Sequence, residues 1–214
     1  MPEAPHPSLQ LRRSDALLVV DVQRDFLPGG ALAVTDGDRV IGPLNDCLDA
    51  FAAAGRVVFA SRDWHPPGHV SFHAQGGPWP PHCVAGTPGA AFPATLHLPP
   101  DAVVISKAQQ RDREAYSAFA GTDLAQQLRR AGLRRLFVGG LATDYCVLRT
   151  VLDARWLGFD VVVLSDAIAA VEAEPGAGER AIAEMQRAGA TFVDRRDVVV
   201  EALRPPSGEG ASTP

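Results

Sequence analysis

The sequence predicts a single α/β domain with three layers, in which a mostly parallel, Rossmann-like sheet lies between two layers of helices. Short apolar runs rich in valine alternate along the chain with segments of helical periodicity, which is typical of a parallel sheet covered on both faces. Most of these runs are almost continuously apolar, as expected for strands that are buried on both sides. Each helical segment ends directly before a glycine, a residue that often terminates helices.

Six apolar runs are the expected strands. The first reads ALLVVDV and the fifth reads DVVVLS, so valine and leucine dominate both. These residue types pack well on the surface of a buried sheet. The expected strands are residues 16–22, 56–61, 102–106, 136–140, 160–165 and 191–193.

Four segments between these runs are the expected helices. In residues 38–54, apolar side chains such as Val40, Leu44, Leu48 and Phe51 recur at the spacing of one helix face. The other expected helices are residues 123–131, 143–157 and 177–188.

The expected folded domain spans residues 14–203. Residues 1–13 and 204–214 contain several prolines and few apolar residues in sequence, and we interpret both as flexible tails. Residues 62–101 are rich in Pro, Gly, His and aromatic residues and have no regular periodicity. A long irregular segment inside a compact domain is usually functional, so we expect this one to contribute to a site.

Composition excludes several classes of protein. The chain has 214 residues, of which 46% are hydrophobic, and a formal net charge of −5. This length and apolar content suit one folded domain rather than a disordered chain. The absence of a basic block argues against nucleic acid as a partner, and no apolar run is long enough to span a membrane. With no signal-peptide pattern at its start, the chain is expected to be cytoplasmic.

Ionisable side chains follow four successive expected strands. Asp21 follows the first strand, Asp63 and His65 follow the second, Lys107 follows the third, and Cys146 follows the fourth. In open α/β sheets, ligands bind beyond the carboxyl ends of the strands. We therefore expect these side chains to converge at one edge of the sheet.

Cys146 is the candidate nucleophile. It falls in the first turn of the expected helix 143–157, where free N–H groups and the helix dipole lower the pKa of a thiol and can hold an oxyanion. The alternative is a small buried core cysteine. Asp21 and Lys107 beside the thiol would move its proton and stabilise its charge, although the two could also form a plain ion pair. Cys47 lies on the expected helix 38–54 and is interpreted as a packing residue.

The irregular segment also carries candidate metal ligands. Asp63 and His65 are two residues apart, so in an extended chain both side chains point the same way. His82, in the stretch WPPHC, can supply a third ligand, and His69 is either a fourth ligand or a supporting residue. Two imidazoles and a carboxylate suit Zn²⁺ or Fe²⁺, among other ions. The unpaired loop histidines, His73 and His97, are interpreted as surface residues.

Cys83 directly follows His82, but successive residues of an extended segment point to opposite sides. We therefore interpret Cys83 as a small packing residue that faces away from the metal site. All three cysteines are widely spaced in the chain and are expected to be reduced thiols.

Four stretches make the chain resemble the nicotinamidases (pyrazinamidases) among the isochorismatase-like cysteine hydrolases. The stretches are VVDVQRDFLPGGALAV, SRDWHPPGHVSF, WPPHCVAGTPGA and GGLATDYCVLRTVLDA. The resemblance covers residues 16–199, and the Asp-x-His stretch together with WPPHC narrows it to nicotinamidases. It implies a six-stranded sheet with the order 3-2-1-4-5-6.

The resemblance also implies site residues. The implied catalytic triad is Asp21, Lys107 and Cys146. The implied metal ligands are Asp63, His65 and His82. The implied oxyanion hole consists of the N–H groups of Ala142 and Cys146, next to a cis peptide between Ala142 and Thr143. The implied walls of the ring pocket are Phe26, Trp79 and Tyr116, each of which could instead be a core aromatic.

The implied activity is hydrolysis of nicotinamide to nicotinate and ammonia, and of pyrazinamide to pyrazinoate, through a cysteine thioester in NAD salvage. One divalent ion is expected, Zn²⁺ first, with Fe²⁺ or Mn²⁺ as alternatives. Homo-oligomers occur in the family, so a homo-oligomer is a further expectation. Two alternative functions are a related amidase acting on a ureido or carbamoyl compound and a catalytically silent binding protein.

Overall fold

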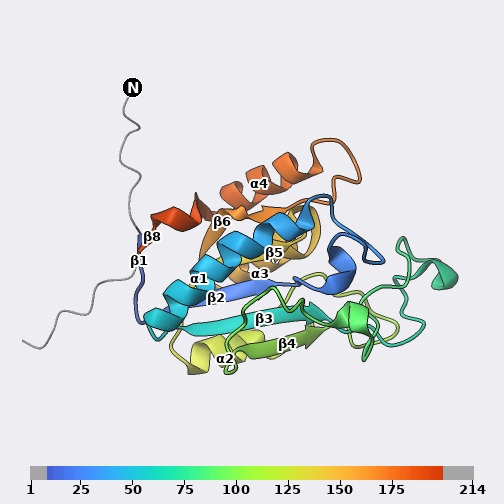
Figure 1. The fold of residues 1–214 in the computed structure, drawn as a ribbon, viewed down its shortest axis with the longest axis horizontal. Helices are drawn as coiled ribbons and strands as arrows, with labels where there is room; N and C mark the ends of the chain where they lie inside the picture. Colours follow the sequence, from blue (N-terminus) through green and yellow to red (C-terminus); the bar gives the residue numbers. More distant parts are fainter. Residues whose placement is uncertain (1–8, 200–214) are drawn as a thin grey trace, which may run out of the picture.

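The computed structural model describes residues 9–199 and contains a parallel sheet of six strands with helices on both faces (Figure 1). The strand order is β4-β3-β2-β5-β6-β7, and every neighbouring pair is parallel. Counted along the chain from β2, this is the predicted order 3-2-1-4-5-6, which is confirmed. The strands are β2 (Asp15–Val20), β3 (Val57–Asp63), β4 (Val103–Lys107), β5 (Arg135–Leu141), β6 (Asp160–Ala169) and β7 (Thr191–Val193).

Four α-helices lie close to the predicted positions. They are α1 (Ile41–Ala53), α2 (Leu124–Arg130), α3 (Leu148–Trp156) and α4 (Ala177–Arg187). Two predicted helices begin differently from expectation. A 3₁₀ turn, Gly37–Val40, precedes α1, and a π-helical turn, Thr143–Val147, precedes α3. The π-helical turn forms because the carbonyl of Ala142 accepts hydrogen bonds from the N–H groups of both Tyr145 and Val147, 3.1 Å away in each case.

The sheet is buried on both faces, as its apolar runs predicted. Along β2, Leu18 and Val20 belong to one apolar cluster and Leu17 and Val19 to the other, because successive side chains of a strand point to opposite faces. The first cluster includes residues of α2, α3 and α4, and the second includes residues of α1. This arrangement makes the three layers of the domain.

A second, two-stranded sheet joins the two ends of the described chain. β1 (Leu9–Gln10) pairs in parallel with β8 (Val198–Val199). This pairing was not predicted, because two-residue strands carry no recognisable periodicity. It incorporates residues 9 and 10 of the predicted N-terminal tail into the fold. The rest of that tail up to residue 8, and the predicted tail 204–214, lie outside the described residues.

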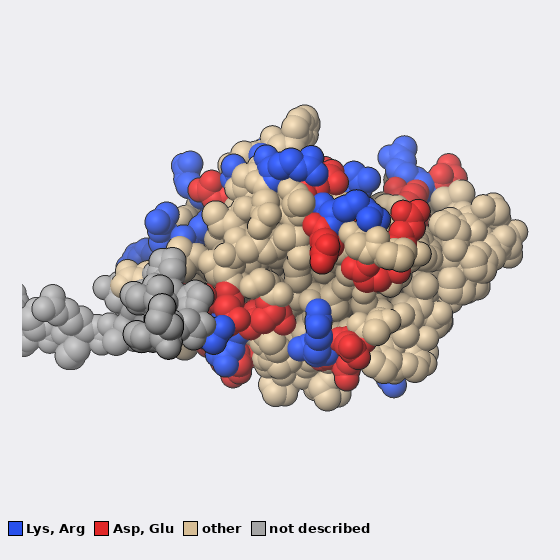
Figure 2. Space-filling model, turned by 90° about the horizontal axis from the view of Figure 1, so that it is seen from above, with Lys and Arg blue, Asp and Glu red and all other residues tan. Residues whose placement is uncertain are grey.

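The connection from β3 to β4 is the predicted irregular segment. Its regular structure consists of the short 3₁₀ turns His73–Gln75 and Pro88–Ala90 and of two isolated β-bridges. Residues 64–100 include no Lys, Arg, Asp or Glu. Figure 1 shows most of this segment at one end of the molecule, beyond the carboxyl ends of β3 and β4, while its last part runs back along the sheet to the start of β4. The same end carries few charged side chains in the view of Figure 2, whereas both signs of charge are interspersed over the rest of that face.

Among residues 9–199, no helix combines the length and the apolar character needed to cross a lipid bilayer.

Candidate active site

The predicted ionisable residues meet at the carboxyl end of the sheet. Strand order reverses between β2 and β5, the point at which open α/β sheets bind ligands. Asp63 and Lys107 are the last residues of β3 and β4, Asp21 directly follows β2, and Cys146 lies in the π-helical turn after β5. The convergence expected from the sequence is therefore present.

Lys107 is the centre of this cluster. Its side chain is fully buried, and its Nζ atom lies 2.9 Å from Asp21 Oδ2 and 2.5 Å from Asp63 Oδ1. Nζ also donates to the carbonyl of Ala115, 3.0 Å away, and to Cys146 Sγ, 3.5 Å away. One ammonium group thus connects two carboxylates and the candidate nucleophile.

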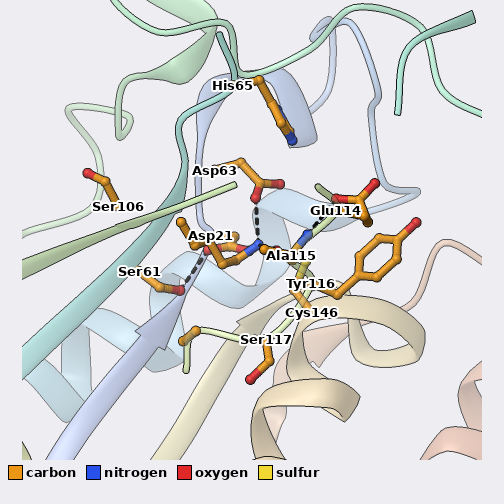
Figure 3. A network of polar contacts seen from close by, with 12 residues as sticks. Asp21, Ser61, Asp63, His65, Ser106, Glu114, Ala115, Tyr116, Ser117 and Cys146 are labelled. Atoms are coloured by element: carbon orange, nitrogen blue, oxygen red, sulfur yellow. Dashed lines mark hydrogen bonds and ion pairs between the residues drawn. The ribbon is translucent and has the colours of Figure 1, made fainter. Parts of the chain in front are cut away.

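Asp21 occupies a tight turn at the end of β2. Its backbone is left-handed, with φ of 48°, and its N–H donates to the carbonyl of Ser61, 3.2 Å away. The hydroxyl of Ser61 donates to Asp21 Oδ1 across 2.6 Å (Figure 3). Asp21 Oδ2 is buried and accepts no well-aligned hydrogen bond from any described residue, although Lys107 is close. This oxygen can therefore receive a proton.

The role of Ser61 was not predicted. A signal is present, because Ser61 is a polar residue in the otherwise apolar run VVFAS.

The pKa values of Asp21 and Lys107 are both raised, but for different reasons. Burial raises the pKa of Asp21, and the positive charge of Lys107 offsets this only in part. Burial alone would lower the pKa of Lys107, but the negative charges of Asp21 and Asp63 outweigh it and hold that pKa well above its ordinary value. The lysine is therefore a permanent cation, and Asp21 is a carboxylate with increased proton affinity.

The pKa of Cys146 corrects one expectation. The sequence predicted a lowered pKa from the helix N-terminus, but burial raises the pKa of this thiol well above its ordinary value. Lys107 acts in the opposite direction, while Asp21 and Asp63 add to the increase. The described chain thus favours the protonated thiol, so that a neighbouring base is needed to form the thiolate.

The predicted metal ligands Asp63, His65 and His82 form one compact group. Their ligand atoms all lie within 4.8 Å of one another, and all three residues are buried. The segment around His82 is bonded alongside His65: the His65 N–H donates to the carbonyl of Cys83 across 3.0 Å, and the Ala85 N–H donates to the carbonyl of His65 across 2.8 Å. Figure 3 shows Asp63 between His65 and Asp21. Its carboxylate belongs to the group with the two histidines and also to a second group with Asp21 and Cys146.

The hydrogen bonds of the two imidazoles fit a metal ion. His65 Nδ1 lies 3.1 Å from the carbonyl of His82, and His82 Nδ1 lies 2.8 Å from the carbonyl of Pro80. Because a carbonyl only accepts hydrogen bonds, each Nδ1 carries the proton and each Nε2 presents a lone pair. Burial and the neighbouring histidines lower the pKa of His65 to about 3, which keeps this ring neutral. Neutral imidazoles and a carboxylate are ligands that suit a divalent ion.

His69 serves the site in another way. Its Nδ1 lies 2.7 Å from the hydroxyl of Ser71, and its Nε2 lies 3.0 Å from the carbonyl of Arg113, to which it donates. Although His69, His65 and Glu114 also form a group of metal-capable atoms, both ring nitrogens of His69 are engaged. The ring lies beside that of His65, with centroids 4.4 Å apart and ring planes tilted by 48°. The geometry therefore favours the supporting role over that of a fourth ligand.

The other histidines and cysteines lie where they were predicted. His73 and His97 are exposed. Cys47 and Cys83 are buried in the apolar cluster on the α1 face, where burial raises the pKa of both thiols, that of Cys47 to about 12. All three cysteines are free thiols.

An apolar pocket opens beside Cys146. Its empty volume is about 370 Å³ with the open mouth included. The three predicted aromatics Phe26, Trp79 and Tyr116 line it, and Trp79 Nε1 donates to the hydroxyl of Tyr116 across 3.0 Å. The remaining lining residues are Leu32, Val34, Asp63, His82, Ala142, Tyr145, Cys146 and Val171.

Tyr145 was missed from the sequence. Its ring makes an edge contact with Trp79, with centroids 5.1 Å apart, and a tilted contact with Tyr116 at 5.7 Å. Its position directly before Cys146 was the available signal.

The cis peptide lies one residue earlier than expected. It joins Leu141 to Ala142, not Ala142 to Thr143. β5 remains paired with β6 through Leu141, so the chain leaves the sheet at the Leu141–Ala142 bond. Ala142 and Cys146 both line the pocket, as the expected oxyanion hole requires.

Comparisons with known proteins agree on one family. Residues 15–197 match the sequence model of the Isochorismatase domain. The nicotinamidase of Escherichia coli (strain K12) is 40% identical to this chain over 203 residues, which cover 85% of this chain and 95% of that protein.

Two solved structures are similar over almost their whole length. The pyrazinamidase of Pyrococcus horikoshii in complex with zinc has a TM-score of 0.81 and 50% identity, covering 85% of this chain and 99% of its own. PnC1 from L. infantum in complex with nicotinate has a TM-score of 0.81 and 38% identity, covering 90% of this chain and 99% of its own.

Proposed function

The chain belongs to the isochorismatase domain family, and we propose that it is a metal-dependent amidohydrolase that converts nicotinamide to nicotinate and ammonia. The observation that carries this proposal is that Asp63 belongs both to the cluster around Lys107 and to the candidate metal site. Its carboxylate pairs with Lys107, which also contacts Asp21 and Cys146, and it lies within the group of metal-capable atoms. A thiol with a base and a metal site beside one small aromatic-lined pocket suits an amide on a nitrogen-containing ring.

In the proposed reaction, Asp21 is the base. Its buried Oδ2 takes the proton of Cys146, whose raised pKa makes such a base necessary. Sγ then bonds to the amide carbon, and the negative charge that develops on oxygen is held by the N–H groups of Ala142 and Cys146. Asp21 returns the proton to the amide nitrogen, and the carbon–nitrogen bond breaks. Ammonia departs, and the acyl group remains on Cys146 as a thioester.

The second half returns the enzyme to its starting state. Asp21 takes a proton from water, and the hydroxide oxygen bonds to the thioester carbon. The carbon–sulfur bond then breaks, Asp21 gives its proton to the thiolate, and nicotinic acid leaves and loses its acidic proton to water as nicotinate. Throughout, Lys107 remains a cation that stabilises negative charge on Asp21, Asp63 and sulfur.

The metal group would consist of Asp63, His65 and His82, with Zn²⁺ as the proposed ion. A bound divalent ion would supply a Lewis acid that can hold the ring nitrogen and orient the carboxamide. Phe26, Trp79 and Tyr116 would wall the ring, together with Tyr145. The relative named as a pyrazinamidase extends the proposal to pyrazinamide, which has the same carboxamide on a similar ring. The cytoplasmic location and the homo-oligomer remain predictions from the sequence.

Ammonia release from nicotinamide tests the activity. We expect release by the zinc-loaded wild type, loss in Cys146→Ala, and a covalent adduct of nicotinoyl mass on the wild type trapped during turnover. Full turnover by Cys146→Ala would contradict the scheme. If nicotinamide releases no ammonia but a ureido or carbamoyl compound is hydrolysed even after complete chelation, the alternative of a metal-independent amidase is favoured instead.

Two neighbouring residues test the metal site. His82→Ala should lose both metal and activity, because it removes an imidazole ligand. Cys83→Ser is the matched control and should keep both, because Cys83 is buried in the apolar cluster and belongs to no metal-capable group of the described residues. Loss of metal in Cys83→Ser would overturn this assignment.

A further inference from the structure

The side-chain amide of Gln23 makes hydrogen bonds with both backbone groups of Asp63, its N–H and its carbonyl. This amide is completely buried. Its Oε1 accepts a hydrogen bond from the Asp63 N–H across 2.7 Å, and its Nε2 donates to the Asp63 carbonyl across 2.8 Å. Nε2 also donates to the carbonyl of Ala90 across 2.9 Å. One side chain therefore satisfies both backbone groups of Asp63 and joins them to the loop that follows His82.

The Gln23 amide takes the place of a hydrogen-bond partner that the neighbouring strand β2 does not provide. β2 ends at Val20, and the chain turns away at Asp21, whereas β3 continues to Asp63. The Asp63 groups that face β2 would consequently have no strand partner, and a buried unpaired N–H or carbonyl is costly. A glutamine side chain offers the same donor and acceptor as a peptide group. It extends the hydrogen bonding of the sheet to the residue that carries the carboxylate.

Asp25 makes a similar hydrogen bond to the segment that carries His82. Its Oδ2 accepts a hydrogen bond from the Cys83 N–H across 2.7 Å, directly after His82. Next to it, the Arg24 N–H donates to the carbonyl of Ala91 across 3.0 Å. The carboxylate lies so close to Gly89 that a Cβ added there would be 2.2 Å from Oδ2. The loop is therefore fitted closely around Asp25.

We propose that Gln23 and Asp25 are positioning residues that set the separation of Asp63 and His82, and so preform the metal site. This inference rests on the proposed function, in which those residues bind the ion. Asp63 and His82 are 19 positions apart in the sequence. The loop that carries His82 has only short 3₁₀ turns and isolated β-bridges of its own. The turn at residues 23–25 bonds to both segments, so it can fix the distance between them. A ligand set held in place before binding loses less freedom when the ion arrives.

The test is zinc affinity, measured on metal-free proteins by competition with a chromophoric chelator. Gln23→Glu removes the donors to two carbonyl groups, and Asp25→Ala removes the acceptor of the Cys83 N–H. We expect each variant to bind Zn²⁺ about tenfold or more weakly than the wild type, the range usual for residues that orient metal ligands. The visible absorption of bound Co²⁺ should also change, since it reports the geometry of the ligands.

Asn45 provides a matched control. Its amide makes the same kind of bridge, donating to the Thr95 carbonyl across 2.8 Å and accepting from the His97 N–H across 2.9 Å. Asn45→Asp makes the same chemical change as Gln23→Glu, but its hydrogen-bond partners belong to none of the metal-capable groups found among the described residues. Its zinc affinity should change by less than about twofold. Asp194→Ala, which removes the acceptor of the Arg196 N–H, is the control for Asp25→Ala.

The outcomes separate this inference from the proposed function. If both variants keep the zinc affinity and cobalt spectrum of the wild type, even with lower melting temperatures, the two residues are merely structural and the inference is wrong. If Gln23→Glu does not fold, Asp25→Ala decides alone. A wild type that binds zinc but does not hydrolyse nicotinamide, with weakened binding in the variants, supports the inference and refutes the function. A wild type that binds no zinc overturns both.

Discussion

Two buried groups of charged side chains lie at opposite ends of the central strand β2. At its amino end, Arg135 donates from Nε to Asp15 Oδ1 across 2.9 Å and from Nη2 to Asp15 Oδ2 across 2.6 Å. At its carboxyl end, the single ammonium of Lys107 faces the carboxylates of Asp21 and Asp63. Both groups join a basic side chain to aspartate, and all of these residues are buried.

The difference between them lies in charge balance. In the first group one cation meets one anion in a two-point contact, so each partner neutralises the other. In the second group two carboxylates share one cation beside a thiol, and the pKa values of Asp21 and Cys146 are both raised. A balanced buried pair supports the fold, whereas an unbalanced one holds groups ready to exchange protons. Four predictions follow from this contrast, in order of decreasing effect.

Asp21→Asn should have the largest effect, on activity. The amide cannot take the thiol proton, so we expect kcat for nicotinamide to fall by about 10³-fold or more, within the range of general-base catalysis. Stability should change little, because the amide can still hydrogen-bond with Ser61 and its oxygen can still face Lys107. Steady-state kinetics together with thermal unfolding measure the two effects. Substantial turnover in this variant would mean that another group is the base.

Asp15→Asn should show the reverse pattern. Removing one partner leaves the Arg135 cation buried without its counter-ion, and breaking such a pair costs about 3 kcal/mol of unfolding free energy. The kcat of the folded protein should stay close to that of the wild type, because the pair is at the far end of the strand. Denaturant unfolding and kinetics on the same preparation check this. A large loss of kcat without loss of stability would invalidate the contrast.

The pH dependence of kcat/KM should report the raised pKa of Asp21. Activity needs the ionised carboxylate, so it should fall as the pH is lowered through that pKa, at a pH above the ordinary range for aspartate. Lys107, whose pKa is well above its ordinary value, should cause no loss of activity on the alkaline side near neutral pH. The acid limb of Asp15→Asn should coincide with that of the wild type. An acid limb within the ordinary aspartate range would contradict the assignment.

Asp160→Asn should have the smallest effect. Asp160 pairs with Arg155 across 3.1 Å, but its side chain is 73% exposed. Water and salt screen such a pair, so the unfolding free energy should change by less than about 0.5 kcal/mol, with kcat unaffected. Thermal unfolding at low and high salt measures this. A change as large as that of Asp15→Asn would show that burial is not what separates the pairs.

Local patterns in the chain were sufficient to predict most of the fold and much of the candidate site. Continuous apolar runs marked the strands of the main sheet, and the polar residues at their ends marked where Asp21, Asp63 and Lys107 would meet. The resemblance to a family added the strand order. By contrast, β1 and β8 are too short to carry a pattern and depend on each other for hydrogen bonds.

The errors concern properties that depend on surroundings. A position at a helix N-terminus suggested a low pKa for Cys146, but its depth of burial and two neighbouring carboxylates reverse the direction. The residue type alone left His69 open as a fourth ligand or a supporting residue, and only its contacts with Ser71 and Arg113 reveal that both ring nitrogens are engaged. The contribution of Tyr145 to the pocket likewise depends on which way its ring faces.

Periodicity and the direction of parallel strands were enough to identify the residues of the main sheet and the ionisable side chains that reach its carboxyl edge. The proton affinities at that edge, and the hydrogen bonds that hold the loop carrying His82, follow only from the folded chain. Those depend on desolvation and on contacts between segments such as Gln23 with Asp63, and Asp25 with Cys83. A pKa or a ligand distance is set by the atoms that surround a group in space, most of which are distant in the chain.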